Sequence, residues 1–496
     1  MQTRDSKLRH LGNFSLGDGK QIFGELRIRG SKTRLSLNSS EYIPTHNIPI
    51  NCITGVLLDL SKVSLLDCVT PRAPGHSTGP RGTYYFADVF AHYVTIGDYF
   101  VGPKDATIRK ITVYLDDAKV LFHDFKAFGI VFEAEPFVKE ILQGDPYRDG
   151  HATGPNARIL YYTGHDEVVS GDTVFGRVLV EHRPDLLSDD HDGGVLRDEI
   201  AVSLEFKSAV LFHEAIMRIQ TLIEYFGLLV GRPQNLKSMY VATEESIKTS
   251  KLLTVYWNMY SKRDGPKERS RPSSHDILID GVRQPEAFIS VLAKWLERHE
   301  VWHSARWRFF NSFFEQRHYD VDRLVGAANM FDVLPPTAAP MDNQLSDELV
   351  KARIDCRALF AKLPISPERD SVLNCLGRLG KSSLKRKIRY RAQAIIDQAG
   401  ERFPDLIRIS DQAVDCRNFY VHGSEGAFDY ERNFDAVIFF TNTLEFIFAI
   451  SDMIEAGWDF KSWTTEGSSL SHPFGEYKIE YRRNAQKLFA LLPRPR

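Results

Sequence analysis

Hydrophobic and polar residues alternate along the N-terminal half of the chain, from residue 12 to about residue 207. Short runs of Val, Ile, Tyr and Phe, such as Gly24–Arg29, Thr33–Leu37 and Ile108–Leu115, are separated by Gly, Asp, Asn and Pro. A period of two is that of a half-buried β-strand, and short strands between turn residues are typical of a sandwich or a distorted barrel. The pattern therefore predicts a β-rich, sandwich-like N-terminal domain.

The period changes over residues 208–231, which are followed by two strand-like stretches near 238–242 and 253–259. Apolar residues recur there at helical spacing: Val210, Ile216, Ile219, Leu222, Ile223, Phe226 and Leu229. Gly231 and Pro233 end the run, as glycine and proline commonly end helices. We therefore place one helix within the β-rich domain, residues 1–261, and interpret the polar, proline-containing residues 262–285 as a linker.

Residues 286–456 have a helical pattern, so we predict an α+β multidomain protein whose second domain is an all-α bundle. Candidate helices cover 287–298, 301–315, 320–333, 346–362, 370–378, 384–401, 405–422 and 431–456. The apolar run Ala436–Ile450 contains polar residues and is shorter than the ~20 residues that span a bilayer, which favours a buried helix and no membrane contact. The tail, 457–496, is aromatic and basic, and we assign it no function.

Composition narrows the class of protein. The chain has 496 residues, 43% of them hydrophobic and 26% charged, with a net charge of −2. A protein that coats nucleic acid along its length is normally basic, so any RNA contact must be a local patch. The five cysteines are scattered and the first residues lack the apolar core of a signal peptide. Both features favour a soluble cytoplasmic protein with reduced thiols.

The predicted helix 405–422 separates apolar and polar side chains. Its core-facing residues are Leu406, Ile409, Ala413, Cys416 and Tyr420, whereas Asp411, Asp415, Asn418 and His422 share the opposite face. Arg417 lies on the flank, from which its long side chain can reach the polar face. Gly423 is a plausible end to the helix and leaves His422 in the last turn, where the helix dipole favours a protonated imidazole.

RNA cleavage through its own 2′-hydroxyl needs few chemical groups. Histidine moves protons near neutral pH, and arginine neutralises charge on the phosphate as it becomes five-coordinate. Asn418 could orient the imidazole or hold a phosphate oxygen. Arg417, Asn418 and His422 are therefore the candidate catalytic residues, and this chemistry requires neither a metal nor another cofactor.

The segment Arg417-Asn418-Phe419-Tyr420-Val421-His422-Gly423 resembles the R-x4-6-H signature of HEPN domains. Its position late in a helical bundle, just before a long apolar helix, is similar to that in the ApeA-type anti-phage proteins. These proteins carry a β-rich domain before the nuclease, and Leu11–Leu16 followed by Phe23–Leu26 resembles the start of that domain. The resemblance covers most of the chain and is most specific over residues 405–456.

The resemblance implies an endoribonuclease of abortive infection. It implies a homodimer or higher homo-oligomer in which two copies of the motif face each other, so that each cleft holds two arginines and two histidines. Arg417 would polarise the phosphate, His422 would be general acid or base, and Asn418 would orient. The expected products carry a 2′,3′-cyclic phosphate and a 5′-hydroxyl. Transfer RNA is a natural candidate substrate, the N-terminal domain would act as a sensor, and a phage component would be the trigger.

A run of cations precedes the motif, and Tyr390 lies among them. Its members are Lys381, Lys385, Arg386, Lys387, Arg389 and Arg391. They could contact RNA phosphates while Tyr390 stacks on a base, although a solvated helix face explains the same pattern equally well.

Two other classes of function stay open. A non-catalytic protein could use an HEPN-like bundle to bind RNA or to dimerise. His299-Glu300-Val301-Trp302-His303 is a literal H-E-x-x-H, the pattern in which two histidines hold zinc and a glutamate activates water. Arg306 stands where the longer metalloprotease motif has glycine, and Glu315 would have to supply the third ligand. This zinc hydrolase is the weaker reading.

Overall fold

The computed structural model describes residues 8–17, 20–44, 52–143, 153–189, 193–260, 272–341 and 345–493. The chain divides into two compact units, Met1–Ile289 and Ser290–Arg496. Most of the charged part of the predicted linker, residues 262–271, lies outside the described residues. Residues 272–284 form turns and irregular backbone that lead to helix α5 (Pro285–Glu297).

The first unit is built on one large antiparallel sheet, which contains thirteen strands within the described residues. This confirms the β-rich domain that the alternating pattern predicts. Strand β2 (Ile22–Ile28) shows the basis of the prediction, because buried residues alternate along it with more exposed ones. The described part of this unit also contains three short helices that the sequence did not predict, α1 (Ala118–Leu121), α2 (Glu135–Gln143) and α4 (Glu244–Lys248).

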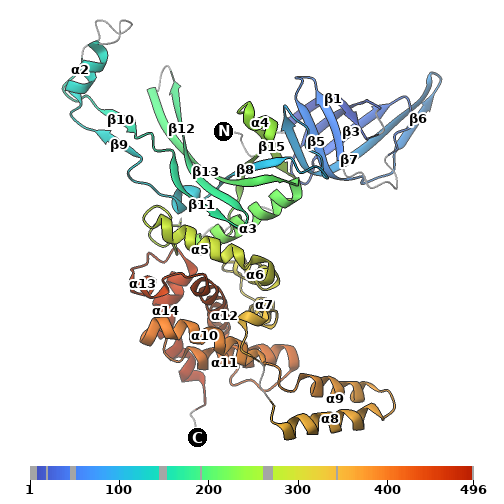
Figure 1. The fold of residues 1–496 in the computed structure, drawn as a ribbon, viewed down its shortest axis with the longest axis vertical. Helices are drawn as coiled ribbons and strands as arrows, with labels where there is room; N and C mark the ends of the chain where they lie inside the picture. The colour runs from blue at the N-terminus through green and yellow to red at the C-terminus, as the bar shows by residue number, and fades with distance from the viewer. Residues whose placement is uncertain are drawn as a thin grey trace. The chain divides into compact units, whose positions relative to one another are not determined.

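Six strands of this sheet close on themselves. They are β1 (Leu8–Ser15), β2, β3 (Arg34–Ser39), β4 (Cys52–Leu57), β5 (Lys62–Val69) and β7 (Gly82–Gly97). The path runs β7-β3-β2-β1-β4-β5 and returns to β7, because β5 also pairs with β7. The apolar side chains of these strands, among them Phe14, Leu26, Leu65 and Val89, form one buried cluster. The N-terminal part of the sheet is therefore a small barrel (blue in Figure 1).

The remaining strands extend the sheet away from the barrel. They are β8 (Ile108–Leu115), β11 (Glu167–Thr173), β12 (Gly176–Asp189), β13 (Gly193–Val210), β14 (Leu236–Thr243) and β15 (Leu253–Trp257), with β6 (Gly75–Gly79) paired to β7. Helix α3 (Phe212–Val230) packs against β8 and β13 and ends at Gly231, whose φ of 82° suits glycine. The helix predicted at 208–231 is therefore confirmed. A short hairpin of β9 (Phe128–Val131) and β10 (Ile159–Tyr162) projects from the sheet with α2 (Figure 1).

The second unit is helical, as the sequence predicts. Its helices after α5 are α6 (His299–Phe313), α7 (Val321–Asp332), α8 (Asp347–Ala361), α9 (Pro367–Arg378), α10 (Leu384–Ala399), α11 (Leu406–His422), α12 (Phe434–Glu455), α13 (Phe460–Thr465) and α14 (Pro473–Leu491). The predicted helices agree with α5–α12 to within a few residues at each end. The tail, residues 457–496, is helical over most of its described length, in α13 and α14.

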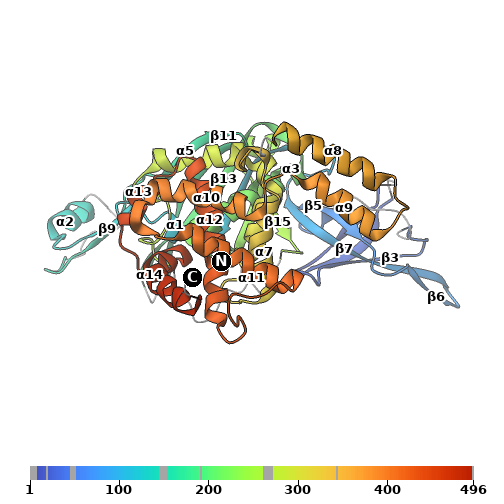
Figure 2. The ribbon, with the colours of Figure 1, turned by 90° about the horizontal axis from the view of Figure 1, so that it is seen from below.

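Helix α12 is the core of this unit. It is long and apolar enough to cross a membrane by composition alone, but 83% of its most apolar window is buried inside the protein. It packs against α6, α7, α10, α11 and α14. The predicted buried helix is therefore confirmed. Figures 1 and 2 show α8 and α9 side by side as a separate hairpin of the same unit.

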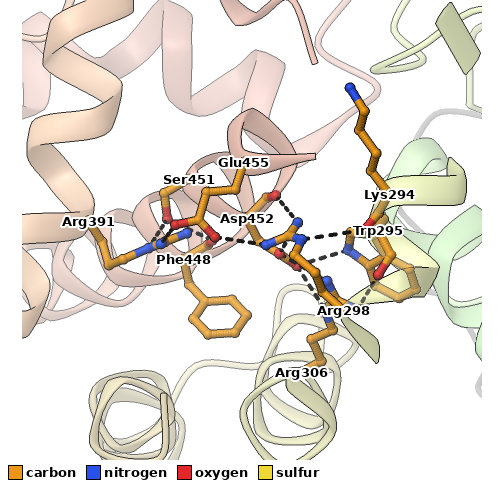
Figure 3. Close-up of polar contacts among 9 residues, drawn as sticks. All are labelled: Lys294, Trp295, Arg298, Arg306, Arg391, Phe448, Ser451, Asp452 and Glu455. Carbon is orange, nitrogen blue, oxygen red and sulfur yellow. Dashed lines mark hydrogen bonds and ion pairs between the residues drawn. The ribbon is translucent and has the colours of Figure 1, made fainter. Parts of the chain in front are cut away.

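Buried charges fix the other helices to α12 (Figure 3). The Asp452 carboxylate accepts hydrogen bonds from Trp295 Nε1 at 2.9 Å and from Arg306 Nε at 2.8 Å. Arg391 of α10 donates to Ser451 Oγ at 2.8 Å and pairs with Glu455. Burial alone would raise the pKa of Asp452, but Arg306 and Arg298 outweigh it and leave this pKa below its ordinary value. The network fixes α5, α6 and α10 around the core helix.

Candidate functional site

Helix α11 carries the predicted motif on its last turns. Leu406, Ile409, Ala413 and Cys416 are buried, as expected for the core-facing stripe, whereas Tyr420, its last predicted member, is only half-buried. The helix ends at Gly423, which has a φ of 65° and donates its N–H to the Phe419 carbonyl at 3.0 Å. Since a left-handed residue at this position commonly ends a helix, the predicted terminator is confirmed. His422 is thereby left exposed in the final turn.

Arg417 reaches across the polar face of α11, as its flanking position suggested. Its Nη1 donates to Asn418 Oδ1 at 3.1 Å and to His422 Nε2 at 3.0 Å. The three residues of the predicted site are therefore brought into one hydrogen-bonded group. They are half-buried or exposed, and none lies in the sealed core.

The contact between Arg417 and His422 joins a guanidinium to an imidazole. A guanidinium only donates hydrogen bonds, so His422 Nε2 is the acceptor in this contact. The charge of Arg417 therefore lies directly beside a ring nitrogen of His422.

A fourth residue, Asn329, belongs to the group and was missed by the sequence analysis. Its Oδ1 accepts from Arg417 Nη2 at 3.0 Å, and it lies on α7, 88 residues earlier in the chain. The only signal in the sequence is an amide between the apolar residues Ala328 and Met330. Such a residue in a helix interior is common enough that it could not have been selected without the fold.

The predicted RNA-binding cations lie along α10, which packs against α11. Lys385 Nζ is 2.5 Å from Asp415, and Arg389 binds both carboxylate oxygens of Asp411 at 2.7 and 2.8 Å. The hydrogen bond and charge of Asp411 raise the pKa of Arg389. Both aspartates on the polar face of α11 therefore form ion pairs with α10.

The other cations of the run differ in their surroundings. Lys387 Nζ donates to the Asp332 carbonyl at 2.9 Å, Arg386 is half-buried, and Lys381 is exposed. Arg391 is only 1% exposed and is bound within the network around α12, so its proposed place in an RNA-binding surface is wrong. The burial of Arg391 could not be inferred from its place in the basic run, where its neighbour Tyr390 is exposed.

The H-E-x-x-H sequence lies at the start of α6. His299 and His303 have ring centroids 5.4 Å apart, and burial together with Arg306 and His303 lowers the pKa of His299 to about 4. Among the residues that the structure describes, no group of three or more His, Cys, Asp or Glu side chains could hold a metal ion. Arg306, which stands where the longer metalloprotease motif has glycine, forms an ion pair with Asp452 and so has a structural role.

These observations define a class of protein: a large antiparallel β unit followed by a helical unit of the HEPN type. Comparison with known families agrees, because residues 9–295 match ApeA N-terminal domain 1 and residues 325–461 match Apea-like HEPN. The first match alone covers more than half of the 496 residues, and the chain belongs to the ApeA family. No curated protein and no solved structure matches it. HEPN domains are typically ribonucleases.

Proposed function

We propose that this protein is a metal-independent endoribonuclease of bacterial anti-phage defence, with Arg417, Asn418 and His422 as its catalytic residues. The proposal rests on one observation above all, the 3.0 Å contact between Arg417 Nη1 and His422 Nε2 at the accessible end of α11. A guanidinium and an imidazole placed side by side are the two groups that cleavage through the 2′-hydroxyl requires.

The reaction begins when a phosphate of the RNA draws the Arg417 guanidinium onto its oxygens, which frees the lone pair of His422 Nε2. That nitrogen then takes the proton of the 2′-hydroxyl, and the 2′-oxygen forms a bond to phosphorus. The bond from phosphorus to the 5′-oxygen breaks, and the leaving oxygen takes a proton from an imidazolium. We assign this acid to His422 of a second copy, facing the first across a homodimer.

The substrate is RNA, and transfer RNA is the natural candidate for a nuclease that stops translation in the cytoplasm. Lys381, Lys385, Arg386, Lys387 and Arg389 would contact its backbone. Lys385 reaches Asp415, which lies one turn from Asn418 on α11, so these cations approach the same helix as the motif. The β-rich unit would sense a phage-derived trigger.

The test uses the purified full-length protein and cellular RNA with a metal chelator present. Arg417→Ala and His422→Ala are expected to lower the cleavage rate by about 100-fold or more, the usual contribution of such groups. Arg408→Ala is a matched control, because Arg408 is an exposed arginine of the same helix that stacks on Phe489. Sequencing of the ends should show a 2′,3′-cyclic phosphate and a 5′-hydroxyl.

The alternatives give different results. Full cleavage by either motif variant contradicts the assigned residues. A wild-type protein that binds RNA and never cuts it favours the non-catalytic RNA-binding or dimerisation protein. Cleavage that the chelator abolishes, together with loss of activity in His303→Ala and bound zinc in the purified protein, favours the zinc hydrolase.

A further inference from the structure

We propose that Asn329 of α7 is a positioning residue that holds Arg417 during RNA cleavage, an inference that rests on the proposed function. Among the described contacts of Arg417, the one to Asn329 Oδ1 is the only side-chain hydrogen bond from outside α11. The other two acceptors, Asn418 and His422, move with the helix that carries the arginine.

The helix that carries Asn329 is itself firmly held. Asp320 caps its first turn by accepting the Arg323 N–H at 2.7 Å, and the Arg323 guanidinium pairs with buried Glu445 of α12 at 2.9 Å. Ala328 and Met330, on either side of Asn329, are buried. The amide therefore projects from a helix with little freedom to shift, which is what a positioning group requires.

Asn329 fixes the plane of the guanidinium as well as its place. Arginine has several rotatable bonds, and contacts to Nη1 alone would let the group turn about that nitrogen. Because Asn329 accepts from Nη2 while Asn418 and His422 accept from Nη1, the planar group is held at both ends. The Nε atom is buried with no hydrogen-bond partner among the described residues, so these three contacts carry the positioning.

The contact to Asn329 matters most in the chemical step. Nη1 must leave His422 Nε2 before that nitrogen can accept the 2′-hydroxyl proton. The hydrogen bond from Nη2 to Asn329 does not compete with the base, and it can persist while Nη1 turns to the phosphate. Asn329 is thus a pivot that keeps the positive charge near the reacting phosphorus.

The experiment compares single-turnover cleavage and RNA binding by full-length variants. Asn329→Ala should lower the rate at saturating RNA by about 10- to 100-fold, as misplacement of a catalytic group does. The Kd for RNA should change less than about twofold. Asn442→Ala is the matched control, because Asn442 is another half-buried asparagine of the helical unit and accepts from Tyr319 at 2.7 Å, away from Arg417. Its rate should stay near that of the wild type.

A double variant separates positioning from loss of structure. The Arg417→Lys variant keeps the positive charge, but lysine has a single side-chain nitrogen and cannot bridge Asn329 and His422 as the planar guanidinium does. If Asn329 acts through Arg417, adding Asn329→Ala to Arg417→Lys costs little further rate. If the cleavage rate of the double variant falls by the product of the two single-variant losses, the positioning role is wrong. Equal rate losses in Asn329→Ala and Asn442→Ala also overturn it.

The two proposals also fail differently. If Asn329→Ala cleaves RNA at the wild-type rate, the positioning role is wrong and the proposed nuclease function stands. A wild type that cuts no RNA removes both proposals.

Discussion

Charged side chains inside the most apolar helix of the protein each have an opposite charge beside them. On α12, Glu445 is 3% exposed and lies 2.9 Å from Arg323, while Asp452 is 3% exposed and lies 2.8 Å from Arg306. A buried charge without such a partner is costly, because it has lost the solvation of water without replacement. These residues therefore position helices, and their removal tests that role directly.

Asp452→Ala is expected to lower the free energy of unfolding by roughly 3–5 kcal/mol, because it leaves buried Arg306 uncompensated. Urea denaturation measures the change. Asp429→Ala is the control, since its ion pair with Arg432 is exposed and should contribute less than about 1 kcal/mol. The pKa of Asp452 is lowered in the folded protein. Its contribution to the free energy of unfolding is therefore complete above the ordinary carboxyl pKa of about 4, and it is lost as the pH falls through the lowered pKa of the folded state. An equal loss in both variants at pH 7 contradicts the argument.

At the scale of single elements, the helices of the second unit could be predicted because local sequence determines them. Ser346, Ser366 and Ser383 each accept the backbone N–H three residues later and so begin α8, α9 and α10. The closure of the barrel could not be predicted in this way. It depends on which strands pair, and β3 joins β7 through residues as far apart as Leu35 and Val89.

The same limit applies to the candidate site. Arg417 and His422 are five residues apart on one helix, about 140° apart around its axis, and the long arginine side chain reaches across that separation. Asn329 joins them only because α7 packs against α11, and the ion pairs of Lys385 and Arg389 depend on the packing of α10. Sequence alone therefore identified the part of the site that a single helix builds.

The end of α11 offers a test at this scale. Gly423→Ala is expected to destabilise the protein by about 1–2 kcal/mol, because its φ of 65° is unfavourable for a residue with a Cβ. Among the described residues, apart from its two chain neighbours, no heavy atom lies within 4 Å of the position of an added Cβ, so the cost is conformational and not steric. Gly467→Ala is the control, since that glycine also has open space and lacks a positive φ. Thermal unfolding should show a lower Tm for the first variant alone, and equal Tm values would contradict this account of the helix end.

At the scale of the whole molecule, the net charge of −2 means that any RNA binding must depend on a few local cations. Removing one phosphate contact should reduce the slope of log Kd against log salt by about one. Lys381→Gln is expected to show this change, because Lys381 is exposed at the start of the basic run. Lys461→Gln, at an exposed lysine on α13, should leave the slope unchanged. Identical slopes for Lys381→Gln and the wild type would exclude Lys381 from the RNA-binding surface.

The place of α12 in the chain sets the order in which the protein can be made. All six barrel strands lie before residue 98, whereas the core helix of the second unit is not complete until Glu455. Domains generally fold from the N-terminus during synthesis, at about 5–20 residues per second. The barrel strands are therefore synthesised tens of seconds before α12, the core helix against which α11 packs, is complete. A chain that ends between residues 423 and 433 carries the whole motif and none of α12, so it lacks the core helix against which α11 packs.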